Sequence, residues 1–515
     1  MNLTQSIHRA RQQNPEQCAT IFGSRRRTVD EHFDRVARLG GALRQLGLGD
    51  GDRVGIMALN SDRYAEVLLA VPWAGGVLMP LNTRWSAPEI LYALDDSTTT
   101  ILLVDATFAP LVAELAPNAP SLTSVIYVDD APEPAGMRSY EDLIAGTAPA
   151  PDQHRGGDDL VGIFYTGGTT GEPKGVAISH ANLLTSALGS LATFPFTASG
   201  GRLLHTAPMF HLADLAAWVM QSVVGGTHVV VPAFDPPAVL QAIEEHAVST
   251  ALLVPTMIQM LADHPDASSH DLSSLRVVLY GASPISTAVL DRAMKCFSAA
   301  SFVQAYGMTE LSPVATLLSA DDHADQSLLR SAGRAATHSE VRIADEDDND
   351  VPPGTVGQIL VRGGHVMQGY WNKPEETAEA LRGGWMHTGD AGYLNEHGYL
   401  FVVDRVKDMV ISGGENIYST EVENALAKHP AVAACAVIGV PDDRWGERVH
   451  AVVVLKPDQA ATMEELQEHA RTLISSYKIP RSIEFRDALP ISAAGKILKR
   501  DLRAEHWEAG GRGVN

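Results

Sequence analysis

Glycines, hydroxyl side chains and one lysine are concentrated in residues 162–179, which read GIFYTGGTTGEPKGVAIS. An apolar stretch that predicts a buried strand ends at Tyr165, and the polar residues follow it directly. The backbone N–H groups of such a turn, with its hydroxyls and ammonium group, can cradle an anion. The segment lacks the G-K-[ST] ending of a Walker A loop, so it predicts an anion site of another kind. The candidate ligands are Thr166, Gly167, Gly168, Thr169, Thr170, Gly171 and Lys174.

A second group of chemically useful side chains lies in residues 304–310, QAYGMTE. Tyr306 offers a flat face for stacking, Thr309 a hydroxyl, and Glu310 a hard oxygen ligand of the kind that Mg²⁺ prefers. A tyrosine–glycine pair alone is usually packing, but a threonine and a glutamate directly after it are hard to explain as core. The small residues Gly281, Ala282 and Ser283 would let a flat ring approach the backbone.

Two charged residues follow in motifs of their own. Asp390 ends the stretch WMHTGD, and its acceptor-only carboxylate can bind both hydroxyls of a ribose. Taken alone, Asp390 is just as readily a turn cap. Lys496 lies in LPISAAGKILKR, where an isolated lysine would normally be a solvated side chain.

The elements that must position these residues alternate along residues 1–340. Residues 52–58 predict a buried strand, 63–71 a helix and 77–80 the next strand. Such alternation is typical of α/β units around mostly parallel sheets. Further strands are predicted at 100–104, 229–231, 251–254 and 277–279.

Beyond residue 340 short strands and turns predominate. Residues 393–403 predict a hairpin, and the acidic run 345–350 predicts a solvated turn, since it lacks the glycine and distal glutamate of a calcium loop. The polar segment 404–408 then precedes a region with its own strand–helix pattern. We therefore predict two domains, residues 1–404 and 405–515, with a hinge at 404–408.

Composition excludes several classes of protein. The 515 residues are too many for one compact core, and 39 basic against 62 acidic residues give a formal net charge of −23, which argues against a nucleic-acid partner. The most apolar stretches are interrupted by proline, glycine or polar residues, so no integral membrane association is expected. Three dispersed cysteines and a start without an apolar signal core predict a cytoplasmic protein.

Residues 471–503 differ from the rest of this acidic chain. They contain eight basic residues and three acidic ones. A local excess of positive charge is what a polyphosphate ligand would need, and a solvated basic face is the other interpretation.

These motifs occur in the order found in the adenylate-forming acyl-CoA synthetases, and the chain resembles this family from about residue 160 to 500 and in its first 150 residues. The family is related to luciferases and to peptide-synthetase adenylation domains. The resemblance implies an α/β fold with a large N-terminal domain of αβ-layered subdomains, a small β-barrel-like part, and a small mobile α+β C-terminal domain. It also implies ATP, Mg²⁺, CoA and a carboxylic acid as ligands.

The resemblance assigns roles to individual residues. The 166–174 loop is expected to embrace the β- and γ-phosphates of ATP, although Gly167 replaces a serine that is common in the family. Glu310 is expected to bind Mg²⁺, and Lys496 to bridge the substrate carboxylate and the α-phosphate as negative charge builds up. Contacts with adenine, ribose and α-phosphate are expected from Gly281, Ala282, Ser283, Tyr306, Gly307, Met308, Thr309, Asp390 and Arg405.

The second half-reaction is expected to use other residues. In the family, the position of Lys407 is the pivot between two arrangements of the C-terminal domain. After the pivot, Gly413 and Gly414 would line a tunnel for the pantetheine arm, and Tyr477 and Lys478 would hold the CoA nucleotide.

The acyl pocket is predicted from the segment that follows PMF, where His211 would border the pocket and gate it. Most of the other candidates are apolar or small, which suits a medium or long alkyl chain or a flat aryl acid. Asp214 either caps a helix or contacts a polar group of the substrate. The candidates are His211, Asp214, Ala216, Val254, Ala282 and Pro313.

The expected function is that of an acid–CoA ligase, with a medium- or long-chain fatty acid favoured over an aryl acid because residues 306–314 resemble fatty-acyl members slightly more. Transfer of the acyl group to a carrier-protein phosphopantetheine is an alternative, but the basic tail favours CoA as the acceptor. A regulatory ATP-binding protein without chemistry is another, and the presence of Lys496, Glu310 and Asp390 argues against it. A homodimer is the open alternative to a monomer.

Overall fold

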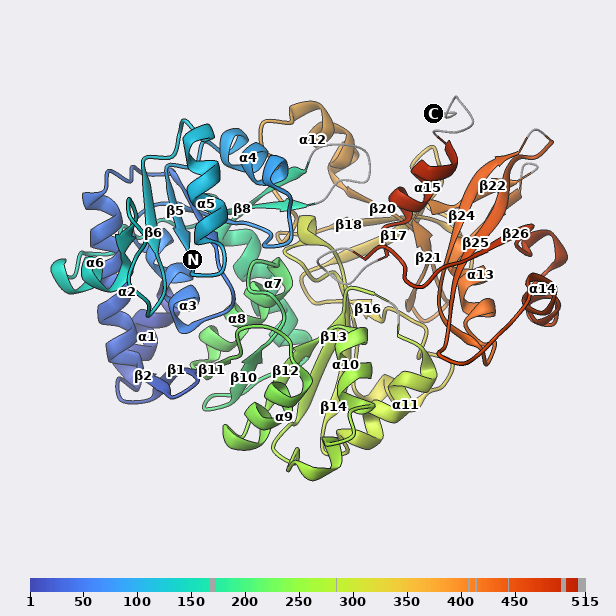
Figure 1. Ribbon diagram of the computed structural model, residues 1–515, viewed down its shortest axis with the longest axis horizontal. Coiled ribbons are helices and arrows are strands. Elements are labelled where there is room, and N and C mark those ends of the chain that lie inside the picture. The colour runs from blue at the N-terminus through green and yellow to red at the C-terminus, as the bar shows by residue number, and fades with distance from the viewer. Residues whose placement is uncertain are drawn as a thin grey trace. The chain divides into compact units, whose positions relative to one another are not determined.

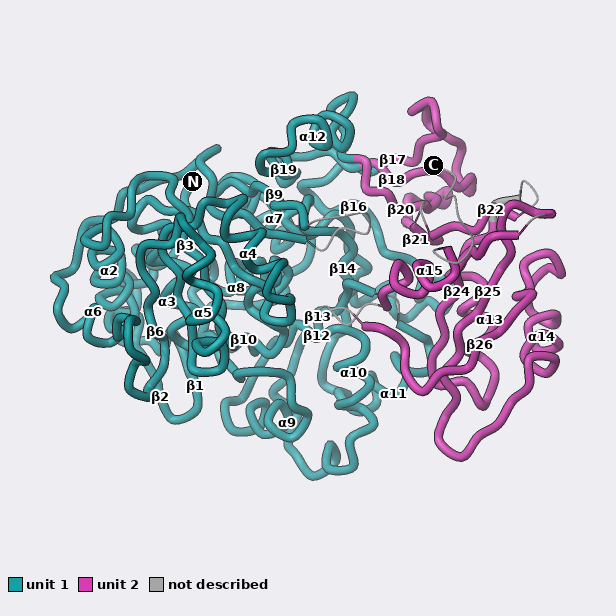
Figure 2. The backbone as a smooth tube through the Cα atoms, turned by 45° about the horizontal axis from the view of Figure 1, so that its top comes forward, with its two compact units in different colours: residues 1–341, 361–386 teal, residues 342–360, 387–515 magenta. Residues whose placement is uncertain are grey.

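The computed structural model describes residues 1–166, 173–283, 285–405, 408–412, 415–442, 444–491 and 497–507. The chain forms two compact units, residues 1–341 with 361–386 and residues 342–360 with 387–515 (Figure 2). Several predicted site residues lie outside the described ranges, so their predicted roles stay predictions: Gly167, Gly168, Thr169, Thr170, Gly171, Lys407, Gly413, Gly414 and Lys496.

The first unit contains an eight-stranded sheet in the order β19-β9-β8-β4-β3-β5-β6-β7 (Figure 1). Its strands from β8 to β7 pair in parallel, whereas β9 pairs antiparallel with both β8 and β19. The strands are β3 (Arg53–Met57), β4 (Val77–Pro80), β5 (Ile101–Val104), β6 (Ser124–Tyr127), β7 (Arg138–Ser139), β8 (Leu160–Thr166), β9 (Lys174–Ser179) and β19 (Gly369–Tyr370).

A nine-stranded sheet in the same unit has the order β16-β15-β14-β13-β12-β10-β11-β1-β2. The run from β14 to β1 is parallel, and antiparallel strands close both ends. The strands are β1 (Cys18–Phe22), β2 (Arg25–Thr28), β10 (Arg202–His205), β11 (Thr227–Val230), β12 (Thr250–Leu253), β13 (Val277–Gly281), β14 (Ser301–Tyr306), β15 (Thr316–Leu318) and β16 (Arg334–Ala335).

Helices cover these sheets, and local signals set their ends. α2 begins with a capping box in which Thr28 and Glu31 bond reciprocally, and α8 ends at Gly225, whose φ of +75° favours glycine. α9, α10 and α11 lie near β12 and β13 (Figure 1), and buried apolar side chains of these elements form one core. The helices are α1 (Gln5–Gln13), α2 (Val29–Gln45), α3 (Asp62–Trp73), α4 (Ala87–Asp96), α5 (Ala109–Leu115), α6 (Tyr140–Gly146), α7 (His180–Thr193), α8 (Leu212–Val224), α9 (Pro236–Glu245), α10 (Pro255–Ala262), α11 (Thr287–Cys296) and α12 (Pro374–Ala380).

The second unit contains most of a four-stranded sheet, β17-β18-β20-β21, and a further sheet built on the long β24–β25 hairpin. α13 packs on β24, and the apolar core between them includes Val422, Leu426 and Val437. The elements are β17 (Glu340–Ala344), β18 (Gly357–Arg362), β20 (Met386–Leu394), β21 (Leu400–Arg405), β22 (Val410–Ser412), β23 (Glu415–Ile417), α13 (Ser419–Leu426), β24 (Val432–Asp442), β25 (Gly446–Leu455), α14 (Met463–Arg471), β26 (Ser482–Phe485) and α15 (Lys499–Trp507).

The predicted α/β organisation is confirmed, and so is the hairpin near residue 395, formed by β20 and β21. The acidic run 345–350 is an exposed turn, apart from the half-buried Asp348. The predicted domain boundary at 404–408 stays a prediction, because the two compact units do not show where the chain would pivot. Within the described ranges, none of the helices combines the length and the apolar character that crossing a membrane requires.

Candidate active site

Four of the predicted site residues lie at or beyond the carboxyl ends of four neighbouring strands of the nine-stranded sheet. β10, β12, β13 and β14 pair in parallel in this order. The carboxyl ends of parallel strands meet at one edge of a sheet, which is where α/β proteins bind ligands. The structure therefore places His211, Val254, Ala282 and Tyr306 along the same edge.

Two glycines at this edge are required by close backbone approach. A Cβ atom on Gly281 would lie 2.2 Å from the carbonyl oxygen of Ala305, and one on Gly307 would lie 1.9 Å from that of Pro313. Neither distance is possible for a real side chain. The small residues that suggested a ring-binding surface thus also let the strands and the following turn pack, and adenine contact stays a prediction.

Glu310 is held by a tyrosine that the sequence did not single out. Its side chain lies in the short helix η3 (Thr309–Leu311), and Tyr370 Oη donates a hydrogen bond to its Oε1 at 2.9 Å. Lys174 Nζ lies 4.9 Å from the centroid of the Tyr370 ring. The Tyr370 side chain therefore contacts both a carboxylate and an ammonium group.

These two charges have the signs that a metal-bound polyphosphate requires. A buried carboxylate supplies hard oxygen ligands for Mg²⁺, and the lysine attracts phosphate oxygens. Glu310 is 6% exposed, so its carboxylate keeps a defined position. The residues present fit a Mg²⁺ ion beside the phosphates.

The predicted phosphate loop begins and ends on paired strands. Thr166 is the last residue of β8 and lies opposite Lys174, the first residue of β9. The Thr166 hydroxyl donates to the carbonyl oxygen of Lys174 at 3.4 Å. The structure thus brings the two ends of the loop together.

Asp390 and Arg405, both predicted to reach the ribose, lie opposite each other on β20 and β21 in the second unit. Arg405 Nε lies 2.9 Å from Asp390 Oδ1. Asp390 is 6% exposed, so the arginine offsets a largely buried negative charge. Their contact with a nucleotide stays a prediction.

Two family models together match most of the chain. Residues 7–371 match the model described as AMP-binding enzyme, and residues 421–496 match that of the AMP-binding enzyme C-terminal domain.

The chain belongs to the AMP-binding enzyme family.

Relatives span almost the whole chain. It is 43% identical over 502 residues to a feruloyl-CoA synthase of an Amycolatopsis species, which covers 96% of this chain and 97% of that protein. It is 36% identical over 517 residues to a fatty acid–[acyl-carrier-protein] ligase of Streptomyces coeruleorubidus, covering 99% and 97%. The structure of an amide bond synthetase from Marinactinospora thermotolerans matches with a TM-score of 0.88 and 31% identity, covering 98% of this chain and all of that one. The comparisons confirm the predicted family, fold and activity class, an AMP-forming acid–CoA ligase.

In this member of the AMP-binding family, the acyl-pocket candidates come from several elements, and His211, Asp214 and Ala216 belong to the start of α8. His211 is the residue before the helix, and its ring lies against that of Phe210 with centroids 4.3 Å apart. Ala216 is buried, whereas Val254 and Pro313 are half-buried and Ala282 is exposed. Whether these residues contact the acyl group stays a prediction.

The proposed capping role of Asp214 is wrong. No side chain caps α8, and Asp214, which lies in its first turn, bonds through Oδ2 to His205 Nδ1 at 2.9 Å. The Asp214 side chain is 1% exposed. The helix dipole still favours its negative charge there, but the contact that orients it is the histidine.

Asp214 ends a chain of buried polar groups. His205 Nε2 lies 2.9 Å from His228 Nδ1, and His228 Nε2 lies 3.1 Å from Ser222 Oγ. One arrangement of protons satisfies all three contacts, because each neutral imidazole donates at Nδ1 and accepts at Nε2. Burial lowers the pKa of His228 far below its ordinary value, which keeps this imidazole neutral.

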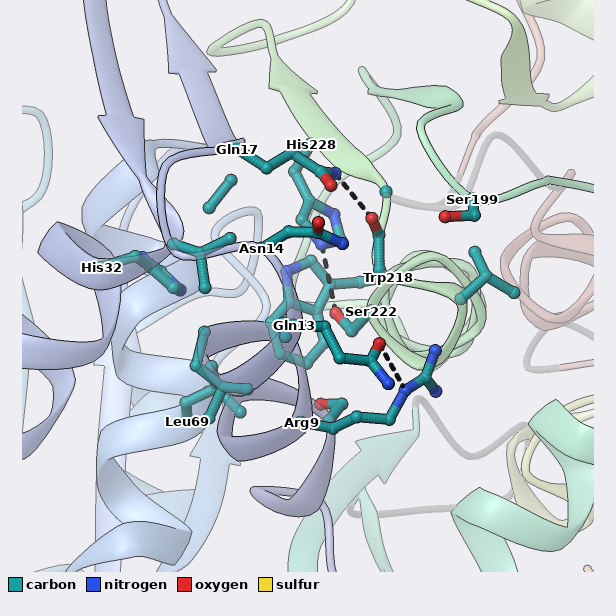
Figure 3. A pocket seen from close by; sticks show the side chains of 18 residues that line it. Arg9, Gln13, Asn14, Gln17, His32, Leu69, Ser199, Trp218, Ser222 and His228 are labelled. Atoms are coloured by element: carbon teal, nitrogen blue, oxygen red, sulfur yellow. Dashed lines mark hydrogen bonds between the residues drawn. The ribbon is translucent and has the colours of Figure 1, made fainter.

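The Ser222 end of this series of hydrogen bonds opens on a small cavity between α1 and the C-terminal half of α8 (Figure 3). Ser222 and His228 line it, together with Arg9 and Gln13 of α1. Its volume of about 50 Å³ leaves room for a few water molecules and not for an acyl group. None of the predicted acyl-pocket residues lines it, so the cavity is separate from the predicted pocket.

We expect Asp214→Ala to lower the free energy of unfolding by about 1–3 kcal/mol, since His205 would keep a buried donor without its acceptor. Asp214→Asn, which retains an acceptor oxygen, should cost clearly less. Neither change should alter the order in which different acids are used, and urea unfolding with a small acid panel checks both expectations. A selective loss of hydroxylated acids in Asp214→Asn would show instead that Asp214 contacts the substrate.

The predicted CoA contacts lie together in the second unit, but their charge is already paired. Lys478 Nζ donates to both carboxylate oxygens of Glu421, at 2.8 and 2.7 Å, and lies 5.5 Å from the ring centroid of Tyr477. A CoA phosphate would have to compete with Glu421 for this ammonium group.

Most basic residues of the tail, residues 471–503, are likewise already paired with carboxylates. Six of the seven basic residues that the structure describes between residues 471 and 503 form ion pairs with carboxylates, and the seventh, Arg481, lies over the ring of Trp445. The local excess of positive charge is thus offset by acidic residues, most of which lie outside residues 471–503. The six are Arg471, Lys478, Arg486, Lys499, Arg500 and Arg503.

Proposed function

We propose that this enzyme forms the CoA thioester of a planar aryl acid of the phenylpropenoate kind. The supporting observation is the 43% identity with a feruloyl-CoA synthase along nearly the full length of both chains, compared with 36% for the fatty-acid relative. We therefore favour an aryl acid as the substrate over the fatty acid that residues 306–314 indicated. The pocket candidates, most of which are apolar or small, also suit a flat ring.

The reaction has two half-reactions. The substrate carboxylate attacks the α-phosphorus of ATP, the bond to the β-phosphate breaks, and pyrophosphate leaves. The CoA thiol then attacks the acyl carbon of the acyl adenylate, the thiol proton passes to solvent, and AMP leaves. No side-chain nucleophile is needed.

The chain's own residues bind and orient the reactants in this proposal. Glu310, oriented by Tyr370, would hold Mg²⁺, which when bound offsets the charge of the phosphates. Lys174 would attract the outer phosphates, and Lys496 would stabilise the charge that develops at the α-phosphate. Thr309, next to Glu310, would donate a hydrogen bond from its hydroxyl to the α-phosphate.

A panel of acids tests the substrate class. Ferulate, cinnamate, benzoate, octanoate and palmitate are compared by kcat/KM for acyl-CoA formation, with product identified by chromatography and the Lys496→Ala variant as background. We expect the two phenylpropenoates to exceed the fatty acids by at least about 10-fold, which corresponds to about 1.4 kcal/mol of transition-state discrimination. A fatty acid that ranks first would reverse the proposal.

The thiol acceptor is tested in the same assay. If acyl adenylate forms but only a carrier-protein phosphopantetheine accepts the acyl group, the carrier-ligase alternative replaces CoA. We further propose that the enzyme works in the cytoplasm, where ATP and CoA are available. The homodimer stays a prediction, which light scattering on the purified protein tests.

A further inference from the structure

Two histidines and a glutamate from separate elements of the second unit converge on one point. His450 lies on β25, Glu484 on β26 and His506 on α15. β25 and β26 are parallel, with His450 opposite Ser482, so Glu484 is the diagonal neighbour of His450 on the same face. The His506 ring approaches from the helix, 4.6 Å from the His450 ring.

Glu484 lies at ion-pair distance from both histidines, but at neither distance does a hydrogen bond form. Glu484 Oε2 is 3.8 Å from His450 Nε2 and 3.9 Å from His506 Nε2, too far for a hydrogen bond. Both Nε2 atoms are buried and have no hydrogen-bond partner. Such orphaned buried atoms are uncommon and require an explanation.

A metal ion supplies that explanation. All three ligand atoms lie within 4.8 Å of one another. Nitrogen and oxygen ligands of tetrahedral zinc lie about 2.0–2.2 Å from the ion, hence roughly 3.3 Å apart. The distances from Glu484 Oε2 to the two Nε2 atoms, 3.8 and 3.9 Å, would each need to shorten by only about 0.5 Å to reach that value.

The surrounding contacts orient the ligands as they do at known metal sites. Ser482 Oγ lies 2.8 Å from His450 Nδ1, which fixes the ring and leaves Nε2 to point at the glutamate. Arg486 Nε donates to Glu484 Oε1, and the Arg486 guanidinium is itself paired with Glu505. The Oε2 atom therefore faces the histidines, and the arginine's charge is offset.

The second such cluster among the described residues, formed by His8, Asp152 and His154, lacks these properties. His8 Nε2 is bonded directly to Asp152 Oδ2 at 2.9 Å, and His154 is 66% exposed. Its polar atoms already have partners, so an ion would have to break a bond to enter.

We propose that His450, Glu484 and His506 form a binding site for one divalent transition-metal ion, with Zn²⁺ as the natural fit for two imidazoles and a carboxylate. Solvent completes the coordination on the side of His506, the more exposed of the two histidines. The ion joins β26 to α15, the two elements that flank residues 486–498, among which Lys496 lies. This inference is independent of the proposed function.

Zinc binding to the full-length protein tests the site. Metal-stripped enzyme is titrated with ZnSO₄ in competition with a chelating dye, and Co²⁺ is added separately to read the coordination from its visible spectrum. We expect one Zn²⁺ per chain, with the intense visible bands of four-coordinate Co²⁺. Because loss of an outer-shell partner alone weakens metal sites 10–100-fold, His506→Gln and Glu484→Gln should weaken binding by at least about 100-fold.

The matched control is His469→Gln. His469 also has a buried Nε2 without a partner and faces another imidazole, that of His429, with ring centroids 5.2 Å apart. No carboxylate completes a cluster there among the described residues. The proposal is overturned if the wild type takes up no zinc, or if the control weakens binding as much as the site variants do. Should a site variant fail to fold, the Co²⁺ spectrum of the wild type decides, since octahedral, weakly coloured Co²⁺ would also reject the site.

Discussion

Lys496→Ala is expected to reduce adenylate formation by about 10²–10³-fold and to leave thioester formation from supplied acyl adenylate nearly unchanged. Only the first half-reaction builds negative charge on the α-phosphate, and removing one preorganised donor to such charge typically costs about 2.7–4 kcal/mol. The second half-reaction starts from a finished mixed anhydride and does not need that donor.

The two half-reactions are measured separately for this variant. Pyrophosphate release reports the first, and acyl-CoA formation from synthetic acyl adenylate reports the second. Arg500→Ala is the control, because Arg500 is a basic residue four positions away whose side chain is 50% exposed and paired with Asp501 at the surface. Equal losses in both half-reactions would show that Lys496 has another role.

Glu310→Gln is expected to reduce pyrophosphate release by about 10²–10³-fold at ordinary Mg²⁺ concentration. The change removes the charge of the proposed Mg²⁺ ligand and keeps the size of the side chain. Part of the activity should return as Mg²⁺ is raised. A pyrophosphate assay over a series of Mg²⁺ concentrations gives both results.

Tyr370→Phe separates orientation from metal binding. It removes only the hydroxyl that donates to Glu310 Oε1, so we expect a loss of about 10-fold, in line with one hydrogen bond to a charged group. If Glu310→Gln were as active as the wild type at low Mg²⁺, Glu310 would not be the metal ligand. If Tyr370→Phe lost more than Glu310→Gln, the tyrosine would act directly on the substrate.

Two of the strands that carry the candidate site, β12 and β13, were predictable because they are largely buried and continuously apolar. Val77–Pro80 was predicted with the same limits that the structure gives, and the other strands predicted within residues 1–340 differ from the observed ones by one or two residues at their ends. Tyr306 and Glu310 were identified from their residue types and their motif, and the strand before them, β14, was not predicted from the sequence.

Contacts between distant segments could not be predicted in this way. Tyr370 reaches Glu310 because β19 pairs with β9, and no local pattern indicates that pairing. Likewise, His205, Asp214 and His228 meet because β10 and β11 are neighbours beneath α8.

The charge of the tail shows the same limit in another form. A count along residues 471–503 finds an excess of basic residues, but most of their acidic partners lie outside this segment. Lys499, for example, pairs with Glu423 at 2.7 Å, and Arg503 with Asp408 at 2.7 Å. A local sum of charges therefore overstates the field that a ligand would meet.

The two-residue strand β19 has a consequence for the solubility of shortened chains. It lies at the end of the eight-stranded sheet, where Gly369 and Tyr370 pair with β9. Five of the six residues of β9 are buried, and a flat apolar edge strand is a template for pairing with another molecule. A chain that stops before Gly369 would keep Lys174 and Glu310 but expose this edge, and we expect it to self-associate rather than to remain as an inactive monomer.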